Sequence, residues 1–539
     1  MSEQLLSIRN LRAALPKTRD RSFAVKDISL DLSEGEILCI IGESGSGKSI
    51  TANAVMGLLP KQIALEAGEI IFRGRDLLKC HQDELRHLRG RSIAMIFQDP
   101  MSALNPLMTV GKQIEEAIRT HSRDTAEDID ERVVRLLKDV GLPAPETIQH
   151  QYPFRMSGGQ RQRVMIAMAM ALDPDILIAD EPTTALDVTT QAQILALIKD
   201  LQRRKKMGVI FITHDFGVVE DIADKVVVMR RGEIVEQGPA REVLADPQHD
   251  YTRSLISAVP RIKTSAERER SSAPSAVVME IKSLNKFYEL PGGLFRKRRQ
   301  VRALHEVSFE IHAGRTLGIV GESGSGKSTL ARQIVRLADN TSGSIVFRGR
   351  DIARSKEREL RPVRPGIQMI FQDPYSSLNP RQSIGQILTA GPRSLGVPRK
   401  SASERALKLL ERVGLSSGAF DRFPHEFSGG QRQRIGIARA LMMDPVILVA
   451  DEAVSALDVS IQAEILKLLK EIQEETGVAI VFITHDLRVA NEICDELIVM
   501  YKGEIVERGL AAEVFWSPQH EYTRTLLDAV PGRAKSQLF

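Results

Sequence analysis

One stretch occurs twice in this chain and decides its fold: Gly42-Glu43-Ser44-Gly45-Ser46-Gly47-Lys48-Ser49 returns unchanged as Gly321-Glu322-Ser323-Gly324-Ser325-Gly326-Lys327-Ser328. Each copy follows an apolar run, 37–41 in the first and 317–320 in the second, and precedes a run that is compatible with a helix, 49–59 in the first and 328–337 in the second. A strand, a glycine-rich loop and a helix in this order are the setting of a phosphate-binding loop. The glycines let backbone N–H groups converge on one concavity, and the helix N-terminus adds positive potential. A chance Gly/Ser-rich turn could explain one copy, but not two in matching contexts, so we predict that the chain binds two nucleotides.

Each loop ends in a lysine and a serine whose side chains suit a nucleotide triphosphate. Lys48 and Lys327 can reach β- and γ-phosphate oxygens, and Ser49 and Ser328 offer a hydroxyl to Mg²⁺. ATP and Mg²⁺ are therefore the expected cofactors.

Bulk composition limits the class of protein. A length of 539 residues suggests two or more domains, and 42% hydrophobic with 27% charged residues is typical of a globular protein. A net charge of +4 and 4% aromatic residues argue against a nucleic-acid partner. No apolar run approaches the roughly 18 residues of a membrane-spanning helix, and the first residues do not read as a signal peptide. The three cysteines are too widely spaced for a disulfide framework or a metal cluster, and Cys39 is expected in the core.

Internal repetition sets the domain organisation. The two loops are 279 residues apart, Gln98 and Gln372 are 274 apart, and Asp180 and Asp451 are 271 apart. We therefore expect two homologous domains, 1–260 and 278–539, joined by a linker at 261–277 that lacks apolar periodicity. The drift is assigned to a few inserted residues, most visibly the stretch 291–300.

Two carboxylates follow an apolar run in each half, Asp180-Glu181 and Asp451-Glu452. The runs read as buried strands, which would deliver both carboxylates to the strand end. The first, Asp180 or Asp451, can hold Mg²⁺ through water, and the second, Glu181 or Glu452, can orient or deprotonate an attacking water.

Further polar residues stand at predicted strand ends in both halves. His214 and His485 end strands in the sequence Thr-His-Asp. A lone histidine is more often a satisfied surface or core residue, but repetition beside the other site strands favours a catalytic role. Gln98 and Gln372 lie in Ile-Phe-Gln-Asp-Pro, where a glutamine can coordinate the metal or the attacking water.

A second phosphate site is expected in each half, far along the chain from the loop. The sequences Ser157-Gly158-Gly159-Gln160 and Ser428-Gly429-Gly430-Gln431 open helices. A serine N-cap followed by two glycines exposes backbone donors at a positive helix end. One nucleotide could thus be held from both sides by two different domains.

With these elements in one order in both halves, the chain resembles ATP-binding cassette (ABC) proteins over nearly its whole length. The resemblance implies an α/β fold of two tandem P-loop NTPase domains, each with a mixed-sheet RecA-like core and a helical subdomain. It identifies the elements as Walker A, Q-loop, Ser-Gly-Gly-Gln signature, Walker B with catalytic glutamate, and H-loop. It also implies head-to-tail pairing, in which the signature of one cassette closes over ATP on the Walker A of the other.

Two further elements narrow the resemblance. Gln98–Pro106 and Gln372–Pro380 are similar to the Q-loop region of dipeptide, oligopeptide and nickel importers, as are the Tyr-Thr-Arg sequences at 251–253 and 522–524. A single chain with both cassettes is similar to the fused ATPase subunit of peptide importers, including the microcin C type.

The chain departs from the family pattern at several positions. Family cassettes usually stack adenine on an aromatic side chain upstream of Walker A, and Tyr288 fits this role. Leu15 stands at the equivalent place in the first half, so adenine binding there is expected to be weaker. Ala453 replaces the proline found at Pro182, and the C-terminal cysteine cluster that many peptide-importer ATPases carry for an iron–sulfur centre is not expected here.

The expected function is that of the ATPase subunit of a peptide importer. By the resemblance it docks on two integral-membrane permease subunits, which insert a short helix between Q-loop and signature, and through them on an extracytoplasmic peptide-binding protein. Its expected location is peripheral, on the cytoplasmic side of the inner membrane. A non-transport tandem ABC ATPase acting on ribosomes or DNA is the alternative, but that class usually has a longer, basic, helical linker. The substrate is not readable from this chain.

Overall fold

The computed structural model describes residues 3–16, 21–122, 125–184, 186–260, 275–290, 299–455 and 457–532. The chain divides into two compact units, Met1–Val259 with Pro531–Phe539, and Pro260–Val530. Most of the predicted linker and residues 291–298 of the predicted insertion lie outside the described residues, so both stay predictions.

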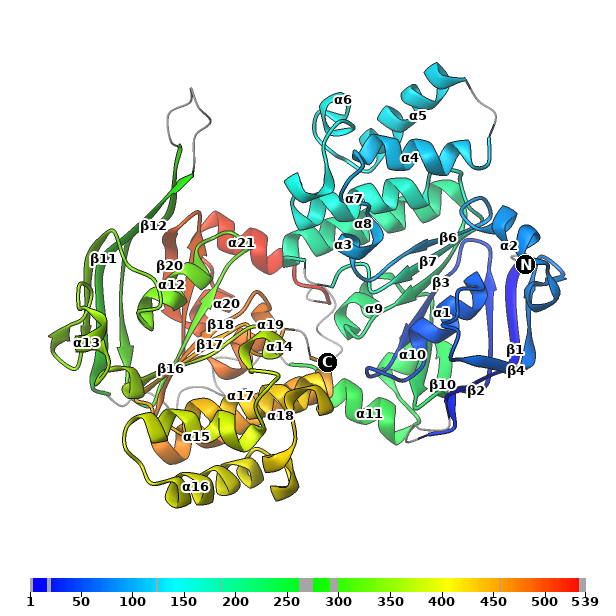
Figure 1. Cartoon of the computed structure of the whole chain (residues 1–539). Helices are drawn as coiled ribbons and strands as arrows, with labels where there is room; N and C mark the ends of the chain where they lie inside the picture. The colour runs from blue at the N-terminus through cyan, green and yellow to red at the C-terminus, as the bar shows by residue number, and fades with distance from the viewer. Residues whose placement is uncertain are drawn as a thin grey trace. The chain divides into compact units, whose positions relative to one another are not determined.

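The first unit contains an antiparallel sheet in the order β2-β1-β4-β5 and a second sheet in the order β10-β9-β3-β8-β7-β6 (Figure 1). In the second sheet β10 alone runs antiparallel to its neighbour. The strands are β1 (Gln4–Ala14), β2 (Phe23–Ser33), β3 (Ile37–Ile41), β4 (Ala64–Phe72), β5 (Arg75–Asp76), β6 (Ile93–Ile96), β7 (Ile176–Asp180), β8 (Gly208–Ile212), β9 (Lys225–Arg230) and β10 (Glu233–Pro239). The helices are α1 (Lys48–Met56), α2 (Gln82–Leu88), α3 (Pro100–Ala103), α4 (Val110–Arg119), α5 (Ala126–Asp139), α6 (Pro145–Ile148), α7 (Gly158–Ala169), α8 (Val188–Lys205), α9 (Phe216–Ile222), α10 (Ala240–Ala245) and α11 (Asp250–Ser257).

The second unit repeats this architecture, with sheets in the orders β12-β11-β14-β15 and β16-β17-β18-β13-β19-β20. Its strands are β11 (Val277–Leu290), β12 (Arg299–His312), β13 (Thr316–Val320), β14 (Ser342–Phe347), β15 (Arg350–Asp351), β16 (Ile367–Ile370), β17 (Ile447–Asp451), β18 (Ala479–Ile483), β19 (Glu496–Tyr501) and β20 (Glu504–Leu510). Its helices are α12 (Lys327–Ile334), α13 (Glu357–Leu360), α14 (Pro374–Ser377), α15 (Ile384–Ser394), α16 (Arg399–Arg412), α17 (Gly429–Leu441), α18 (Val459–Thr476), α19 (Leu487–Ile493), α20 (Ala511–Trp516) and α21 (Glu521–Asp528).

Both faces of the parallel strands are covered, which explains why their sequences are continuous apolar runs. In β3, Leu38 and Ile40 face a core shared with α1 and the antiparallel sheet. Ile37, Cys39 and Ile41 face the core on the other side of the sheet, so Cys39 is a core residue as predicted. The loop that follows β3 is therefore anchored on a strand with no solvent-exposed residue.

The helices after the loops are shorter than the ranges 49–59 and 328–337 that the sequence suggests. α1 ends at Met56 because Gly57 takes the left-handed conformation and its N–H bonds the carbonyls of Asn53 and Ala54. α12 ends at Ile334, and Arg336 two residues later has a φ of 54°. A buried arginine thus follows the end of α12, in a backbone conformation that usually favours glycine.

A helical subdomain leaves the sheet between β6 and β7. Helices α4, α5 and α7 contact one another, and Ile114, Val133 and Leu137 join the core beneath them. Helices α15, α16 and α17 form the corresponding group in the second unit. The predicted fold class, two P-loop units that each combine a mixed sheet with a helical subdomain, is confirmed. No helix within the described ranges is long and apolar enough to cross a membrane.

Candidate nucleotide sites

The glycine-rich loops need glycine for steric reasons. Gly42 has a φ of 147°, and a Cβ there would lie 2.2 Å from the carbonyl oxygen of Met229. Gly47 has a φ of 108°, and a Cβ there would lie 2.8 Å from the carbonyl oxygen of Ala24. Gly321 and Gly326 repeat both features, so at these two positions of each loop the backbone packs against its surroundings too closely for a side chain.

Each loop holds its lysine in a defined place. Lys48 is buried, and its Nζ donates to the carbonyl oxygens of Gly42 at 2.7 Å and Glu43 at 3.0 Å. Lys327 makes the same bonds to Gly321 at 2.7 Å and Glu322 at 2.8 Å. The helices begin at these lysines, and no described side chain caps either helix N-terminus. The ammonium group and the N-terminal amides together suit an anionic phosphate group.

A serine hydroxyl and a buried carboxylate meet beside each loop. Ser49 Oγ lies 3.1 Å from Asp180 Oδ1, and Ser328 Oγ lies 3.3 Å from Asp451 Oδ1. Burial raises the pKa of both aspartates above its ordinary value. Mg²⁺ prefers such hard oxygen ligands, and a cation would offset the cost of the buried charge. The residues therefore fit a magnesium ion.

Three polar side chains converge on the glutamate after β7. Gln98 Nε2 donates to Glu181 Oε2 at 2.9 Å, and His214 Nδ1 lies 3.4 Å from Glu181 Oε1. In the second unit Gln372 donates to Glu452 at 2.7 Å, and His485 Nδ1 lies 3.6 Å from its carboxylate. Thr184 adds a bond to Glu181 at 2.9 Å that sequence reasoning missed.

Glu181 and Glu452 both have a strained backbone conformation, which sets the direction of their side chains. Glu181 has a φ of 46° and Glu452 one of 48°, in the left-handed region that non-glycine residues avoid. Such strain persists where the surrounding structure determines it, and it clusters at functional sites. The Glu181 N–H bonds the Ile212 carbonyl at 3.0 Å and so holds the turn against β8, the strand that leads to His214.

The carboxylate is kept ionised despite its partial burial. Burial alone would raise the pKa of Glu181, but His214, Thr184 and the charge of Lys48 lower it to about 2. Burial likewise opposes ionisation of Glu452, and His485, Lys327 and Gln372 lower its pKa. An ionised glutamate accepts hydrogen bonds only, which suits it to orient a water molecule.

The Ser-Gly-Gly-Gln sequences form helix N-termini, as expected. Ser157 caps α7, accepts the Gln160 N–H at 3.2 Å and donates its own N–H to Gln160 Oε1 at 3.0 Å. Ser428 and Gln431 make the same capping box on α17. A Cβ at Gly429 would meet open space, so packing within the unit does not explain this glycine, whereas close approach of a ligand would.

The predicted residues thus fall into separate groups within each unit. Lys48, Ser49, Asp180 and Glu181 form one cluster with Gln98 and His214. Ser157 to Gln160 stand at the start of α7, with hydrogen bonds between Ser157 and Gln160. Tyr288 lies near the end of β11, 40% exposed, with Lys286 Nζ 5.1 Å from its ring centroid.

Two loop contacts were not predicted from sequence. Arg21 donates to the carbonyl oxygen of Gly45 in the first loop. Tyr251 and Tyr522 accept the backbone N–H of the second loop residue through their hydroxyls, Glu43 at 3.3 Å and Glu322 at 3.1 Å. The two tyrosines are 271 residues apart, the same offset that separates Asp180 from Asp451, and that signal could have found them.

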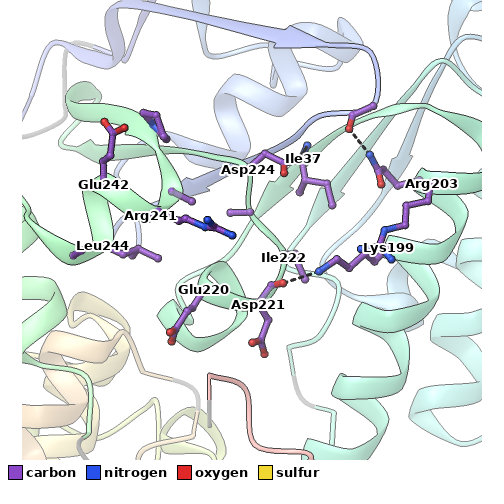
Figure 2. Close-up of a pocket in the computed structure, with 16 residues that line it drawn as sticks. Ile37, Lys199, Arg203, Glu220, Asp221, Ile222, Asp224, Arg241, Glu242 and Leu244 are labelled. Atoms are coloured by element: carbon purple, nitrogen blue, oxygen red, sulfur yellow. Dashed lines mark hydrogen bonds between the residues drawn. The ribbon is translucent and has the colours of Figure 1, made fainter. Parts of the chain in front are cut away.

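A cavity of about 1000 Å³ in the first unit lies apart from this cluster (Figure 2). It opens between α8, α9 and α10, at the amino end of β3, whereas the loop follows the carboxyl end. Lys199 Nζ donates to the Asp221 carbonyl oxygen at 2.9 Å on its wall, and Asp224 accepts the Ile37 N–H at 2.8 Å. Ligands of open α/β sheets bind at the carboxyl ends of strands, so this cavity is not the nucleotide site.

Two family models match the sequence of this chain, each in both halves. A family model described as ABC transporter matches residues 25–184 and 304–455. A second model, described as the C-terminal region of oligopeptide/dipeptide transporters, matches residues 235–303 and 506–538.

Curated relatives match along nearly the whole chain. The glutathione import ATP-binding protein GsiA of Escherichia coli (strain K12) is 47% identical over 557 residues, covering 98% of this chain and 89% of the relative. Its namesake from Salmonella choleraesuis (strain SC-B67) is 46% identical, with coverage of 98% and 90%. Among solved structures, cbiO1 from Clostridium perfringens, part of the ABC transporter complex cbiONQ, is 30% identical with a TM-score of 0.40 and covers 45% of this chain and 91% of its own.

Proposed function

The chain belongs to the ABC transporter family, and on that premise we propose that its two units are tandem cassettes, 1–260 and 278–539, of an importer for peptides or peptide-like compounds. The chain is an ATPase, the energy-coupling ATP-binding subunit of an importer. The proposal also covers the roles of the site residues, the bound metal, the membrane partners, the location of the chain and the class of substrate.

The proposed roles follow from the geometry of the cluster. Lys48 and the loop amides bind the β- and γ-phosphates, and Ser49 with Asp180 would hold Mg²⁺, which when bound neutralises charge on the phosphates. Glu181 orients the attacking water and draws its proton, while His214 and Gln98 fix the carboxylate. The second unit uses Lys327, Ser328, Asp451, Glu452, His485 and Gln372 in the same roles.

The signature residues complete each site from the other cassette. Ser157 to Gln160 and Ser428 to Gln431 present helix N-terminal donors, and their hydrogen bonds run within their own capping boxes. Head-to-tail pairing would place Ser428 against the phosphates held by Lys48, and Ser157 against those held by Lys327. Two composite ATP sites result, with Tyr288 contacting the adenine of the second.

The hydrogen bond from Gln98 to Glu181 carries the proposal of energy coupling. Gln98 follows β6, where the chain leaves the sheet for the helical subdomain, and Gln372 holds the same place after β16. A partner that moves the subdomain would therefore move the glutamine relative to the carboxylate. Conformational control of a catalytic group in this way is a common gate in enzymes.

Exposed apolar side chains on the subdomain support docking of membrane subunits. Leu107 is 84% exposed, and Phe154, 59% exposed, stacks on Tyr152 with ring centroids 5.6 Å apart. Tyr375 and Phe423 are exposed on the second subdomain. Two permease subunits on these surfaces would hold the chain peripherally, at the cytoplasmic face of the inner membrane, and link it to an extracytoplasmic peptide-binding protein. The names of the relatives make glutathione the first substrate to test.

The test is reconstitution with the permease pair and the binding protein in proteoliposomes. We expect ATP-dependent uptake of labelled glutathione or short peptides, and ATP hydrolysis stimulated by the permeases. Leu107→Glu with Phe154→Glu should abolish stimulation but leave basal hydrolysis intact. Leu65→Glu, at an exposed apolar residue of β4, is the matched control.

The proposal would be contradicted if the permeases did not change the rate of ATP hydrolysis and the chain sedimented with ribosomes. That result would favour a non-transport tandem ATPase.

A further inference from the structure

The hydroxyls of Tyr251 and Tyr522 contact the loops at one particular peptide group. In the first unit this group joins Gly42 to Glu43. Its N–H donates to Tyr251 Oη at 3.3 Å, and its carbonyl oxygen accepts from Lys48 Nζ at 2.7 Å. In the second unit the N–H of Glu322 donates to Tyr522 at 3.1 Å, and the Gly321 carbonyl accepts from Lys327 at 2.7 Å. The peptide plane is therefore held at both ends, once by the lysine and once by the tyrosine.

Without the tyrosine hydroxyl, this peptide would lose one of its two described hydrogen bonds and keep the one from Lys48. It follows a glycine with a φ of 147°, a residue that tolerates backbone conformations closed to others. The carbonyl that positions Lys48 belongs to the same rigid plane as the N–H that Tyr251 holds. Loss of one bond thus changes the orientation available to the other.

A fixed turn sets the direction of each tyrosine. Glu236 of β10 accepts the N–H groups of Gln248 at 2.8 Å and His249 at 3.2 Å, and His249 Nδ1 accepts the Tyr251 N–H at 3.0 Å. The second unit repeats this arrangement with Glu507, Gln519, His520 and Tyr522. The helix that carries the tyrosine is therefore attached to the edge strand of the sheet before the phenol reaches the loop.

The rings of Tyr251 and Tyr522 pack against different neighbours, although both hydroxyls accept the same backbone hydrogen bond. The Arg230 guanidinium lies 4.7 Å from the Tyr251 ring centroid, whereas Tyr522 packs on Tyr501 with centroids 4.3 Å apart. Burial raises the pKa of Tyr251 to about 12, so its hydroxyl stays protonated. Two different packings that keep one hydrogen bond indicate that the bond itself is what matters.

We infer that Tyr251 and Tyr522 are positioning residues of the two nucleotide sites, which orient the first peptide of each loop and through it the phosphate-binding lysine. Both tyrosines lie in segments that match the C-terminal family model. These segments therefore contribute to nucleotide binding. The inference rests on the proposed phosphate-binding role of Lys48 and Lys327, and not on the substrate or the permeases.

The test compares Tyr251→Phe, Tyr522→Phe and the double variant with the wild-type chain, using a fluorescent ATP analogue for binding and phosphate release for turnover. Phenylalanine keeps the ring packing and removes the hydroxyl alone. Each single variant should weaken nucleotide affinity at its own site about 2- to 10-fold, the usual effect of one lost hydrogen bond. KM for ATP should rise more than kcat falls, and the melting temperature without nucleotide should stay close to that of wild type.

Thr525→Val is the matched control, because it removes an exposed hydroxyl from α21, the helix that carries Tyr522, and this hydroxyl donates to the Glu521 carbonyl at 3.1 Å and not to the loop. A double-mutant cycle separates positioning from general packing: Tyr251→Phe should add little to Lys48→Ala but should add fully to Lys327→Ala. Unchanged affinity in the Tyr251→Phe, Tyr522→Phe variant would overturn the inference, as would a fall in melting temperature without nucleotide that accounts for the lost affinity. If the wild-type chain binds nucleotide but transports nothing, the proposed importer fails and this inference still stands or falls on binding alone.

Discussion

The two units agree closely on the phosphate side of the site and differ where we expect the base to lie. The lysine-to-carbonyl, serine-to-aspartate and glutamine-to-glutamate distances differ between units by at most 0.2 Å. Near the base, the second unit presents Tyr288, whereas the first has Leu15 and sends Arg21 onto the loop carbonyl of Gly45. Phosphoryl transfer depends on the positions of charges and donors, so it tolerates little variation, while a base can be held by any of several surfaces.

The largest expected effect tests whether the phosphate-binding parts of the two units are equivalent. The Glu181→Gln, Glu452→Gln double variant should hydrolyse ATP about 10²- to 10⁴-fold more slowly, because a positioned catalytic group commonly contributes that much. ATP binding should persist, since both loops are unchanged. The two single variants should have equal rates in a steady-state phosphate-release assay. A single variant with the full wild-type rate would show that its unit does not use the carboxylate, and the equivalence would be broken.

The next largest effect tests the difference between the two units near the expected position of the adenine base. Tyr288→Leu should weaken ATP binding at the second site about 5- to 150-fold, the effect of losing stacking worth about 1–3 kcal/mol. Leu15→Tyr should strengthen binding at the first site. Titration calorimetry on each variant resolves the two sites, with Trp516→Leu, at an exposed aromatic residue of α20, as the control. If Tyr288→Leu left both affinities unchanged, the assignment of Tyr288 to the adenine would be wrong.

A smaller effect concerns the core beneath the loops. Cys39 of β3 has Gly318 as its counterpart, where a Cβ would lie 2.7 Å from Cys494 Sγ and 2.4 Å from Leu497 Cδ2. In the first unit Ala223 and Val226 occupy the places of Cys494 and Leu497, so the two cores fill similar space with different residues.

Gly318→Cys should therefore destabilise the second unit by about 1–3 kcal/mol through overpacking. Adding Cys494→Ala and Leu497→Val, which restores the first unit's set, should recover most of the loss in a calorimetric melt. Gly436→Ala is the control, because a Cβ there meets open space. A triple variant no more stable than Gly318→Cys alone would contradict this account of the two cores.

The parts of the site that the sequence predicts are those that follow directly from strand ends. Gln98, Asp180, Glu181 and His214 each come at or just after a parallel strand, and neighbouring parallel strands deliver their ends to one edge. The repeat allowed each of these predictions to be checked within the same chain.

The contacts that sequence reasoning missed depend on packing over long separations. Tyr251 reaches a loop 208 residues earlier, and the path depends on how α11 docks through Glu236 and His249. The early end of α12 before Arg336 is set by tertiary bonds of a buried guanidinium, including one to the Ile352 carbonyl at 3.0 Å. Neither the docking of α11 nor the early end of α12 can be inferred from local helix propensity.

The measurement that tests the central proposal most directly is a pair of double-mutant cycles on ATP hydrolysis with the permeases present. If the cassettes pair head to tail, Lys48 and Ser428 serve one site, so Lys48→Ala with Ser428→Ala should cost little more than the worse single change. Lys48→Ala with Ser157→Ala would damage both sites and should cost considerably more. Coupling of Lys48 to Ser157, with additivity toward Ser428, would mean that each cassette is a self-contained site and would contradict the account.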